Sequence, residues 1–387
     1  MQRKGLLKSY VFHELKERLK CEPTYESGMI LSSMCTKPHK FAVSIFTKFI
    51  EKNVGDATLF PKVFEMEKEV VKMIGDLLSN PHPSGHIVSG GSEGNLLALW
   101  VARKMKKGKN KVIIPKSAHV SLRRAIDILN LKLVEVNLNQ NFQVNINEVK
   151  RAIDDKTLAL VGVAGSTDLG IIDPIDELSE LASTHDLYLH VDAAFGGFVI
   201  PFLKELGYKV NDFDFRLKGV DSITIDPHKM GLCPIPAGGI IFRNESYLNL
   251  IKERIPYGAY GEFEYATITS TRSGAAVLAV WALLKHFGFE GYLKIVRKCM
   301  RVTEALVEEI NEIKGLALMT PPIMNIVGIR SENIDLHLIV NELAKRGWFI
   351  SYLPTHIRLV IMPHVKLWHI KRFCKDLKEI VKLHKFD

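Results

Sequence analysis

Short apolar runs of strand length alternate along the middle of the chain with amphipathic stretches of helical period. Residues 158–164 form the clearest run, because their unbroken apolar character predicts a strand buried on both faces of a sheet. Strands are predicted at residues 112–115, 133–136, 158–164, 187–192, 219–226 and 239–243. Helices are predicted among them at residues 96–105, 120–129, 145–153 and 175–184. This alternation predicts an α/β fold with a mostly parallel central sheet.

The two ends of the chain carry a different pattern. Before the first strand, helices are predicted at residues 6–20, 40–52 and 63–78. After the last strand, helices are predicted at residues 274–287, 291–313, 336–346 and 368–383, with strands near 323–329 and 357–362. Residues 256–263 are rich in Tyr and Gly without a clear period, so we expect a mobile, irregular segment. We expect three parts: an arm at 1–55, a large α/β domain at 56–275 and a small C-terminal α+β domain at 276–387.

The charge balance changes this picture little. The 387 residues include 52 Lys and Arg against 43 Asp and Glu, a formal net charge of +9. Such a charge favours anionic ligands, and a basic nucleic-acid-binding α/β protein is one alternative. The positive residues do not form one long block, however, and stretches such as 104–111 are typical of solvated helix faces. We therefore expect no nucleic-acid partner.

The five cysteines are scattered without a C-x-x-C pair. Their spacing argues against a structural zinc site and against a disulfide framework, so no metal is expected. The first residues lack the apolar run of a signal peptide, and the chain lacks the run of about 18 apolar residues that a membrane span requires. We expect a cytoplasmic protein with no membrane partner.

One lysine is distinguished by its position. Residues 219–225 resemble a buried strand, and Pro227 ends it because proline cannot donate the next ladder hydrogen bond. Lys229 then lies at the mouth of the sheet, where desolvation is expected to lower its pKa. A neutral amine there is a nucleophile that forms imines with aldehydes. An ordinary hydrated surface lysine is the alternative for any single lysine.

Other polar residues follow predicted strands at the same edge. A glycine-rich turn at residues 90–92 precedes a helix and offers backbone N–H groups and the Ser92 hydroxyl to a phosphate, although it could be an ordinary turn. His119 lies between a strand end and a helix start, where it either meets a ligand or caps the helix. Thr167 and Asp192 follow buried strands, and a carboxylate in that position needs a cationic partner.

These groups together match one cofactor. The turn at residues 90–92 suits a phosphate, and His119 suits an aromatic ring. Thr167 suits a ring hydroxyl, Asp192 a protonated ring nitrogen and Lys229 an aldehyde. Pyridoxal 5'-phosphate carries all five groups, and a carboxylate at its ring nitrogen would make the ring an electron sink. The sequence therefore predicts pyridoxal phosphate as the cofactor.

The chain also resembles a known family over essentially its whole length. The resemblance is carried by residues 85–93 (GHIVSGGSE), 190–197 (HVDAAFGG), 222–231 (SITIDPHKMG) and 361–364 (IMPH). These stretches are similar to those of the group II pyridoxal-phosphate-dependent amino-acid decarboxylases, especially the archaeal L-tyrosine/L-aspartate decarboxylases. The resemblance implies fold type I, the fold of aspartate aminotransferase. It also implies a homodimer with its active sites at the subunit interface.

The resemblance further implies how the cofactor is held. Lys229 is the Schiff-base lysine, and Asp192 partners the ring nitrogen. His119 stacks on the ring face opposite Ala194. Three residues hold the phosphate and a fourth lies near the ring hydroxyl: Gly91, Ser92 and His228, with Thr167.

By the same resemblance, Arg358 receives a substrate carboxylate, and a tyrosine of a mobile loop protonates the substrate carbon. Tyr257 is the best match for that tyrosine, and Tyr260 is the alternative. Positive charge for an acidic substrate side chain could come from the arm segment Lys37-Pro38-His39 or from Arg272. Each also has a plain structural alternative, since Arg272 could anchor the following helix and Lys37 could face solvent.

We therefore expect a carboxy-lyase that removes the α-carboxyl group of an amino acid. The predicted catalytic residues are Lys229, His119, Tyr257 and Arg358. L-Aspartate, giving β-alanine for coenzyme A biosynthesis, is the expected substrate. The alternatives within the family are L-tyrosine, giving tyramine for methanofuran biosynthesis, and L-glutamate, giving γ-aminobutyrate. A carbon–carbon lyase similar to sphingosine-phosphate lyase is a more distant alternative.

Overall fold

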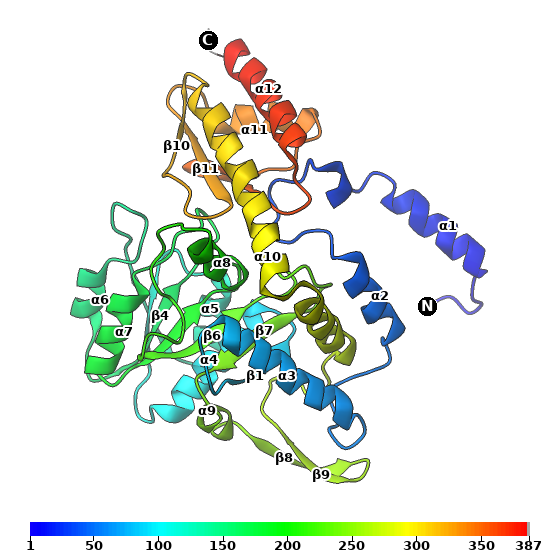
Figure 1. The fold of residues 1–387 in the computed structure, drawn as a ribbon, viewed down its shortest axis with the longest axis vertical. Coiled ribbons are helices and arrows are strands. Elements are labelled where there is room, and N and C mark those ends of the chain that lie inside the picture. The colour runs from blue at the N-terminus through cyan, green and yellow to red at the C-terminus, as the bar shows by residue number, and fades with distance from the viewer. Residues whose placement is uncertain (385–387) are drawn as a thin grey trace.

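A computed structural model describes residues 1–384. Its centre is a seven-stranded sheet with the strand order β1-β7-β6-β5-β4-β2-β3 (Figure 1). The strands are β1 Ser84–Val88, β2 Lys111–Pro115, β3 Lys132–Val136, β4 Thr157–Val163, β5 Tyr188–Asp192, β6 Val220–Ile225 and β7 Gly238–Phe242. β7 runs antiparallel to its neighbours β1 and β6, and the other neighbouring strands are parallel. The predicted mostly parallel sheet is confirmed.

Helices cover both faces of this sheet, and its strands β2, β4, β5, β6 and β7 are buried along nearly their whole length. In β2, Ile113 packs into one core while Val112 and Ile114 pack into another, as the two-residue period of a strand requires. α4 contacts β5, β6 and β7, whereas α7 contacts β4 and β5. The helices of this part are α3 Pro61–Leu77, α4 Gly91–Met105, α5 Val120–Ile128, α6 Ile146–Ala152, α7 Ile175–Thr184, α8 Ile200–Glu205 and α9 Ser246–Asn249.

The C-terminal part forms a smaller lobe with its own antiparallel sheet, in the order β10-β11-β13-β12. Its elements are β10 Leu316–Leu318, β11 Ile326–Ser331, α11 Leu336–Lys345, β12 Ser351–Leu353, β13 His356–Val360 and α12 Leu367–Leu383. A separate core that includes Leu306, Trp348 and Phe373 holds it together. Residues 385–387, the end of the predicted small domain, lie outside the described residues.

One long helix, α10 Gly274–Asn311, joins the two lobes (Figure 1). The pattern predicts two helices here, and the axis does break at Gly288, whose φ of 54° and ψ of −167° are not helical. Glycine adopts this backbone without the clash that a Cβ atom would cause. α10 packs against α2 and α3 of the N-terminal part and against α12 of the small lobe.

The N-terminal arm begins with α1 Lys8–Leu19, which projects from the body of the molecule (Figure 1). Among residues 1–384, α1 contributes no buried side chain. The arm then returns to the small lobe, where Leu31 donates to the carbonyl of Phe349 at 2.8 Å and accepts from Val360 N at 2.7 Å. α2 Lys40–Lys48 follows and packs on α10. Across the described part of the chain, none of the helices has the length and apolar character needed to cross a membrane.

Two segments differ from the predicted structure. Residues 256–263, predicted to be irregular, form most of a hairpin of β8 Glu253–Gly258 and β9 Gly261–Tyr265. Its side chains are exposed or half-buried along both strands, so the sequence lacks the apolar alternation that marks a strand. β1 was also not predicted, because its sequence SGHIV contains few β-forming residues and runs directly into the glycine turn.

Candidate active site

Five loops leave the same edge of the central sheet, because β1, β2, β4, β5 and β6 run in one direction. This edge is where open α/β sheets bind ligands. The loops surround a cavity of about 370 Å³. All residues predicted to contact the cofactor line this cavity: Gly91, Ser92, His119, Thr167, Asp192, Ala194, His228 and Lys229. Residues from five separate loops thus meet in one place.

The glycine turn opens α4 at the wall of the cavity. Within the described chain, no side chain caps the first turn of this helix. Its free N–H groups and the positive end of the helix dipole suit an anion. A Cβ atom at Gly91 would lie 3.0 Å from Oδ2 of Asp226 and 3.2 Å from Cβ of Ala194. Glycine at this position therefore leaves the space that a phosphate needs.

Asp192 ends β5 and is 6% exposed. Its Oδ2 accepts a hydrogen bond from Nδ2 of Asn95 at 2.9 Å, and its Oδ1 accepts from the backbone N–H of Ala194 at 3.1 Å. Both donors are neutral, so among the described residues no hydrogen-bonded cation balances this carboxylate. A protonated ring nitrogen of a ligand in the cavity would balance it.

Asn95 links Asp192 to two histidines, and the sequence patterns did not identify it. It lies in the second turn of α4 and is 1% exposed. Its Nδ2 also donates to Oγ of Ser121 at 3.0 Å, and its Oδ1 lies 2.9 Å from Nε2 of His190. Oγ of Ser121 lies 2.9 Å from Nδ1 of His119. Asp192 and His119 are therefore linked through the same two buried side chains, Asn95 and Ser121.

One arrangement of protons satisfies this network. Because Oδ1 of Asn95 is an acceptor, Nε2 of His190 must donate, and Nδ1 of His190 then accepts from the Ser222 hydroxyl at 2.8 Å. Burial lowers the pKa of His190 to about 4, which keeps this ring neutral near pH 7. Nδ1 of His119 accepts from Ser121 in the same way, so its proton is on Nε2.

Lys229 follows β6 by four residues, in the loop that Pro227 opens. Its Nζ lies 3.1 Å from Oδ2 of Asp226. Burial alone would lower the pKa of Lys229, but the carboxylates of Asp226 and Asp192 outweigh it and raise the pKa above its ordinary value. The prediction of a lowered pKa is therefore wrong. The main cause of the raised pKa is the carboxylate of Asp226, a residue that the sequence patterns did not place in the site.

Arg358 approaches the cavity from β13 of the small lobe. Its guanidinium donates to the carbonyl of Thr167 at 3.0 Å, to the carbonyl of Ser32 at 2.7 Å and to Oγ of Ser351 at 2.7 Å. Thr167 lines the cavity, whereas Arg358 is not among the lining residues of the described chain. Arg358 therefore joins the loop after β4 to the arm and to the small lobe.

The two candidate tyrosines lie far out on the hairpin. Tyr257 is 81% exposed and Tyr260 is 85% exposed, and in the described chain neither lines the cavity. The tip of the hairpin is held by the turn before α3: Asp56 accepts from the N–H of Ala259 at 2.9 Å, and Thr58 Oγ1 accepts from the N–H of Tyr260 at 3.1 Å. Among the described residues, the structure does not bring these tyrosines to the site.

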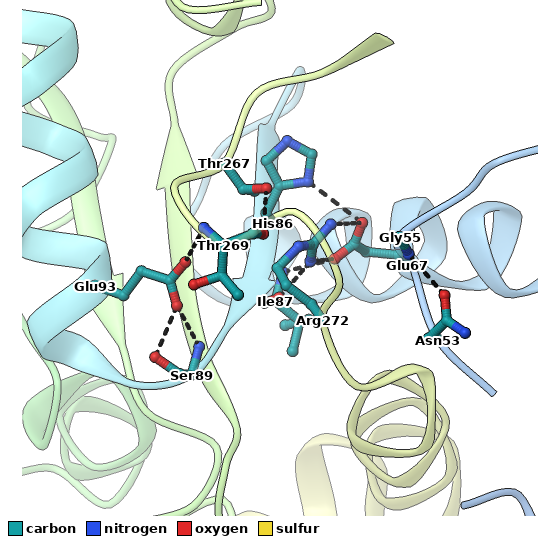
Figure 2. Close-up of polar contacts among 10 residues, drawn as sticks. All are labelled: Asn53, Gly55, Glu67, His86, Ile87, Ser89, Glu93, Thr267, Thr269 and Arg272. Atoms are coloured by element: carbon teal, nitrogen blue, oxygen red, sulfur yellow. Dashed lines mark hydrogen bonds and ion pairs between the residues drawn. The ribbon is translucent and has the colours of Figure 1, made fainter. Parts of the chain in front are cut away.

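The two cations considered for an acidic substrate side chain are bound elsewhere. Lys37 forms an ion pair with Glu26 on the surface. Arg272 is 7% exposed, and its guanidinium pairs with Glu67 and donates to the carbonyl of Ile87 (Figure 2). Of the two alternatives for Arg272, the structure supports a structural anchor. It does not support a substrate contact.

A second carboxylate next to this anchor fixes the glycine turn. Glu93 in α4 accepts hydrogen bonds from the backbone N–H of Ser89 at 2.8 Å and from its hydroxyl at 2.7 Å (Figure 2). Its other oxygen accepts from the N–H of Thr269 at 3.4 Å. The chain that leads from the hairpin into α10 is thereby attached to the turn at the cavity wall.

These observations define a class of protein. A lysine, a buried carboxylate with neutral partners, an imidazole and an uncapped helix N-terminus surround one cavity at the carboxyl edge of a mostly parallel sheet. Pyridoxal phosphate fits this set, since its aldehyde, ring nitrogen, ring face and phosphate each meet a suitable group. The fold and the site define a pyridoxal-phosphate-dependent enzyme of fold type I.

Comparison with known proteins identifies the family. The model of the pyridoxal-dependent decarboxylase conserved domain matches residues 31–331. The chain therefore belongs to the pyridoxal-dependent decarboxylase family, as its sequence motifs predict.

Among relatives, a Pyrococcus horikoshii protein named L-aspartate/L-glutamate decarboxylase is 50% identical over 97% of this chain and 98% of its own. A Thermococcus kodakarensis protein named L-aspartate decarboxylase is 48% identical over 98% of each chain. Among solved structures, a sphingosine-1-phosphate lyase of Burkholderia pseudomallei covers 100% of this chain and 93% of its own, with a TM-score of 0.92 and 27% identity. The last similarity shows that this chain shares its fold with a protein named as a lyase.

Proposed function

We propose that this protein decarboxylates L-aspartate to β-alanine and carbon dioxide, and that the β-alanine is used to make coenzyme A. Family membership gives the reaction type and the cofactor. The names of the Pyrococcus and Thermococcus relatives both include aspartate, which supports this substrate over tyrosine. The observation that carries the proposal is the meeting of Lys229 and Asp192 in one cavity of this family's fold.

When bound, pyridoxal phosphate supplies an aldehyde that bonds to amines and a ring that accepts electrons from the substrate. We assign Lys229 as the lysine that bonds to this aldehyde. Asp192 would hold a proton on the ring nitrogen, and His119 and Ala194 would lie against the two faces of the ring. The remaining contacts, to the phosphate and the ring hydroxyl, come from Gly91, Ser92, His228 and Thr167.

We assign Arg358 to the substrate α-carboxylate. Its guanidinium now bonds to neutral oxygens of Thr167, Ser32 and Ser351, and its Nε is buried without a partner among the described residues. A carboxylate is a stronger acceptor for a guanidinium than a carbonyl or a hydroxyl. A substrate carboxylate would therefore replace one of these bonds, which would orient the α-carbon in the cavity.

We further propose that the protein acts as a homodimer, with Tyr257 of one subunit protonating the substrate α-carbon in the site of the other. The 81% exposure of Tyr257 supports this, because a side chain that acts within its own subunit would lie at the cavity. Tyr260 remains the alternative proton donor. The projecting helix α1 also supports a dimer: Leu7, Val11 and Leu15 form an exposed apolar stripe that a second copy would cover.

The cytoplasm is the proposed location. The five cysteines, Cys21, Cys35, Cys233, Cys299 and Cys374, are free thiols, three of them buried in apolar cores. Free thiols suit a reducing compartment.

The deciding experiment is a competition among L-aspartate, L-glutamate and L-tyrosine, with kcat/KM measured from the release of β-alanine, γ-aminobutyrate and tyramine. We expect aspartate to be preferred by the protein loaded with pyridoxal phosphate. Lys229→Ala is the matched control, and it should remain folded and inactive. Preference for tyrosine or glutamate would overturn the substrate while leaving the decarboxylase intact. Loaded protein that decarboxylates none of the three would contradict the proposed reaction on these substrates.

A further inference from the structure

Asp226 directly follows β6, and its side chain is 3% exposed. Its Oδ2 lies 3.1 Å from Nζ of Lys229 and 3.5 Å from Nε2 of His228. Its Oδ1 is buried and accepts no hydrogen bond from the described residues. The backbone holds Asp226 independently of this carboxylate, since its N–H donates to the carbonyl of Ala194 and its carbonyl accepts from Lys229 N, both at 3.0 Å. A buried carboxylate with an unpaired oxygen is unfavourable for folding, which points to a role toward Lys229.

We propose that Asp226 is a positioning residue that holds the Lys229 side chain, as an ammonium, against the cavity wall whenever this lysine is not bonded to the cofactor. The inference rests on the proposed function of Lys229. When bound, pyridoxal phosphate would exchange its bond to Lys229 for a bond to the substrate nitrogen, and Lys229 would then be free. The lysine nitrogen would take up the protons that the substrate ammonium loses, so each turnover would place an ammonium in a half-buried site, where the Lys229 side chain is 19% exposed.

That ammonium needs a counter-charge, and the cavity offers two carboxylates. If Lys229 paired with Asp192, it would compete with the ring nitrogen for the charge that makes the ring an electron sink. Asp226 lies at ion-pair distance from Nζ, and a Cβ atom at Gly91 would lie 3.0 Å from its Oδ2, so this carboxylate borders the glycine turn. Asp226 therefore keeps the released lysine away from Asp192.

The ionisable groups around Lys229 belong to the β6 loop, the end of β5, the loop before α5 and the arm: Asp226, His228, Asp192, His119 and Cys35. Burial lowers the pKa of His228, so this ring is neutral near pH 7 and does not replace Lys229 as the partner of Asp226. For Lys229, burial favours the neutral amine while Asp226 and Asp192 favour the ammonium. Removal of the Asp226 charge should shift this balance toward the amine.

The test measures acylation of Lys229 in the full-length protein after removal of pyridoxal phosphate, by mass spectrometry of the peptide across pH 7 to 11. Asp226→Asn keeps the shape and the backbone contacts of the residue. At a fixed pH below the midpoint we expect Lys229 to react about tenfold faster in Asp226→Asn, because a nearby opposite charge changes the neutral fraction by about that factor. The matched control is Asp221→Asn, which changes a carboxylate at the start of the same strand that contacts Tyr247 and Leu189. It should react as the wild type does.

Two further readouts separate positioning from a structural role. Asp226→Asn removes a negative charge beside the phosphate turn, so retention of pyridoxal phosphate should not fall; a large fall would mean that Asp226 is structural and would overturn the proposal. An unchanged acylation profile in a folded Asp226→Asn protein would also overturn it. If that variant does not fold, the wild-type profile decides, since Lys229 should reach its midpoint at a higher pH than the ordinary lysine value of about 10.4. A lower midpoint would contradict the proposal. The acylation results concern the cofactor-free protein, so they are separate from failure of the decarboxylase assay.

Discussion

Two carboxylates, Glu67 and Asp192, are buried to a similar degree, at 3% and 6% exposure, and differ in how their charge is balanced. Glu67 pairs with Arg272, lies 3.3 Å from Nδ1 of His86 and accepts from a backbone N–H (Figure 2). Asp192 accepts only neutral donors, Asn95 and a backbone N–H, among the described residues. Asp192 lines the cavity, whereas Glu67 does not.

The comparison shows which buried charge is structural. Burial alone would raise the pKa of Glu67, but Arg272 and His86 hold it below its ordinary value, so this carboxylate is charged and fully paired inside the protein. Asp192 has no ion pair and no hydrogen bond with a cation among the described residues, and it lines the cavity in which the cofactor ring would lie. A paired buried carboxylate stabilises the fold, while one that faces a cavity with neutral partners is available to a ligand.

Breaking the paired carboxylate should have the largest effect, and the effect should be on stability. Glu67→Gln leaves the guanidinium of Arg272 buried without its counter-charge, which typically costs about 3–5 kcal/mol. Chemical denaturation at fixed protein concentration measures this loss. The control is the double variant Glu67→Gln with Arg272→Met, which should recover part of the stability. A single variant as stable as the wild type would contradict a structural role for the pair.

The corresponding replacement of the Asp192 carboxylate by an amide should lower the rate of the reaction. Asp192→Asn keeps the hydrogen-bonding shape but not the charge that supports the ring nitrogen, so we expect kcat to fall by about 10²–10³-fold with little change in the free energy of unfolding. Steady-state kinetics with saturating cofactor, beside denaturation of the same protein, measures both. Tolerance of Asn within a few-fold would make Asp192 a structural residue like Glu67.

His190, which contacts Asn95 behind Asp192, makes the free energy of unfolding depend on pH. Folding lowers the pKa of His190 from about 6.5 to about 4, mainly through burial, so the unfolded chain binds the extra proton first as the pH falls. The stability that depends on a neutral His190 is fully present above pH 6.5 and is lost between about pH 6.5 and pH 4. The total loss in the free energy of unfolding is on the order of 3 kcal/mol. Denaturation at pH 7 and pH 5 tests it, with His190→Gln as the variant that should lose this part of the slope. An unchanged slope in that variant would disprove the assignment.

Loss of the link between Asp192 and its support should have the smallest effect. Asn95→Ala removes the donor to Asp192 and the acceptor for His190, but leaves the carboxylate and its charge in place. We expect kcat to fall about tenfold, because one hydrogen bond to a charged group contributes roughly 1.5–3 kcal/mol and water can replace part of it. Asn141→Ala, in a surface loop, is the control. A loss as large as that in Asp192→Asn would mean that Asn95 does more than orient the carboxylate.

Local sequence patterns predicted six of the seven strands of the central sheet and several residues around the cavity, while Ala194 and His228 were predicted from the family resemblance. Apolar runs mark the strands, and a parallel sheet brings their carboxyl ends together, so Asp192 and Lys229 could be placed at one edge without coordinates. Contacts between distant segments were not predictable in this way. Arg272 meets Glu67 across 205 residues, and no pattern in the sequence links them.

The predictions that failed at the site also failed because they depend on three-dimensional contacts that leave no local sequence pattern. A lone Asn in a helix, such as Asn95, does not differ in pattern from any polar helix residue, although its position one turn after Gly91 places it on the same side of α4. The pKa of Lys229 depends on the direction in which the Asp226 side chain points. The sequence does not determine this direction, although the two residues are only three positions apart. The hairpin was missed because exposed strands lack a one-sided apolar pattern.

The central claim is that Lys229 bonds to pyridoxal phosphate in this cavity, and borohydride tests it most directly. Reduction fixes a lysine–pyridoxal bond as a stable amine, so the yellow colour of the loaded protein should bleach and digestion should yield one pyridoxyl-labelled peptide. We expect the label on Lys229, and none in Lys229→Ala. A label on a different lysine, or a loaded wild-type protein that borohydride leaves unlabelled, would contradict the account.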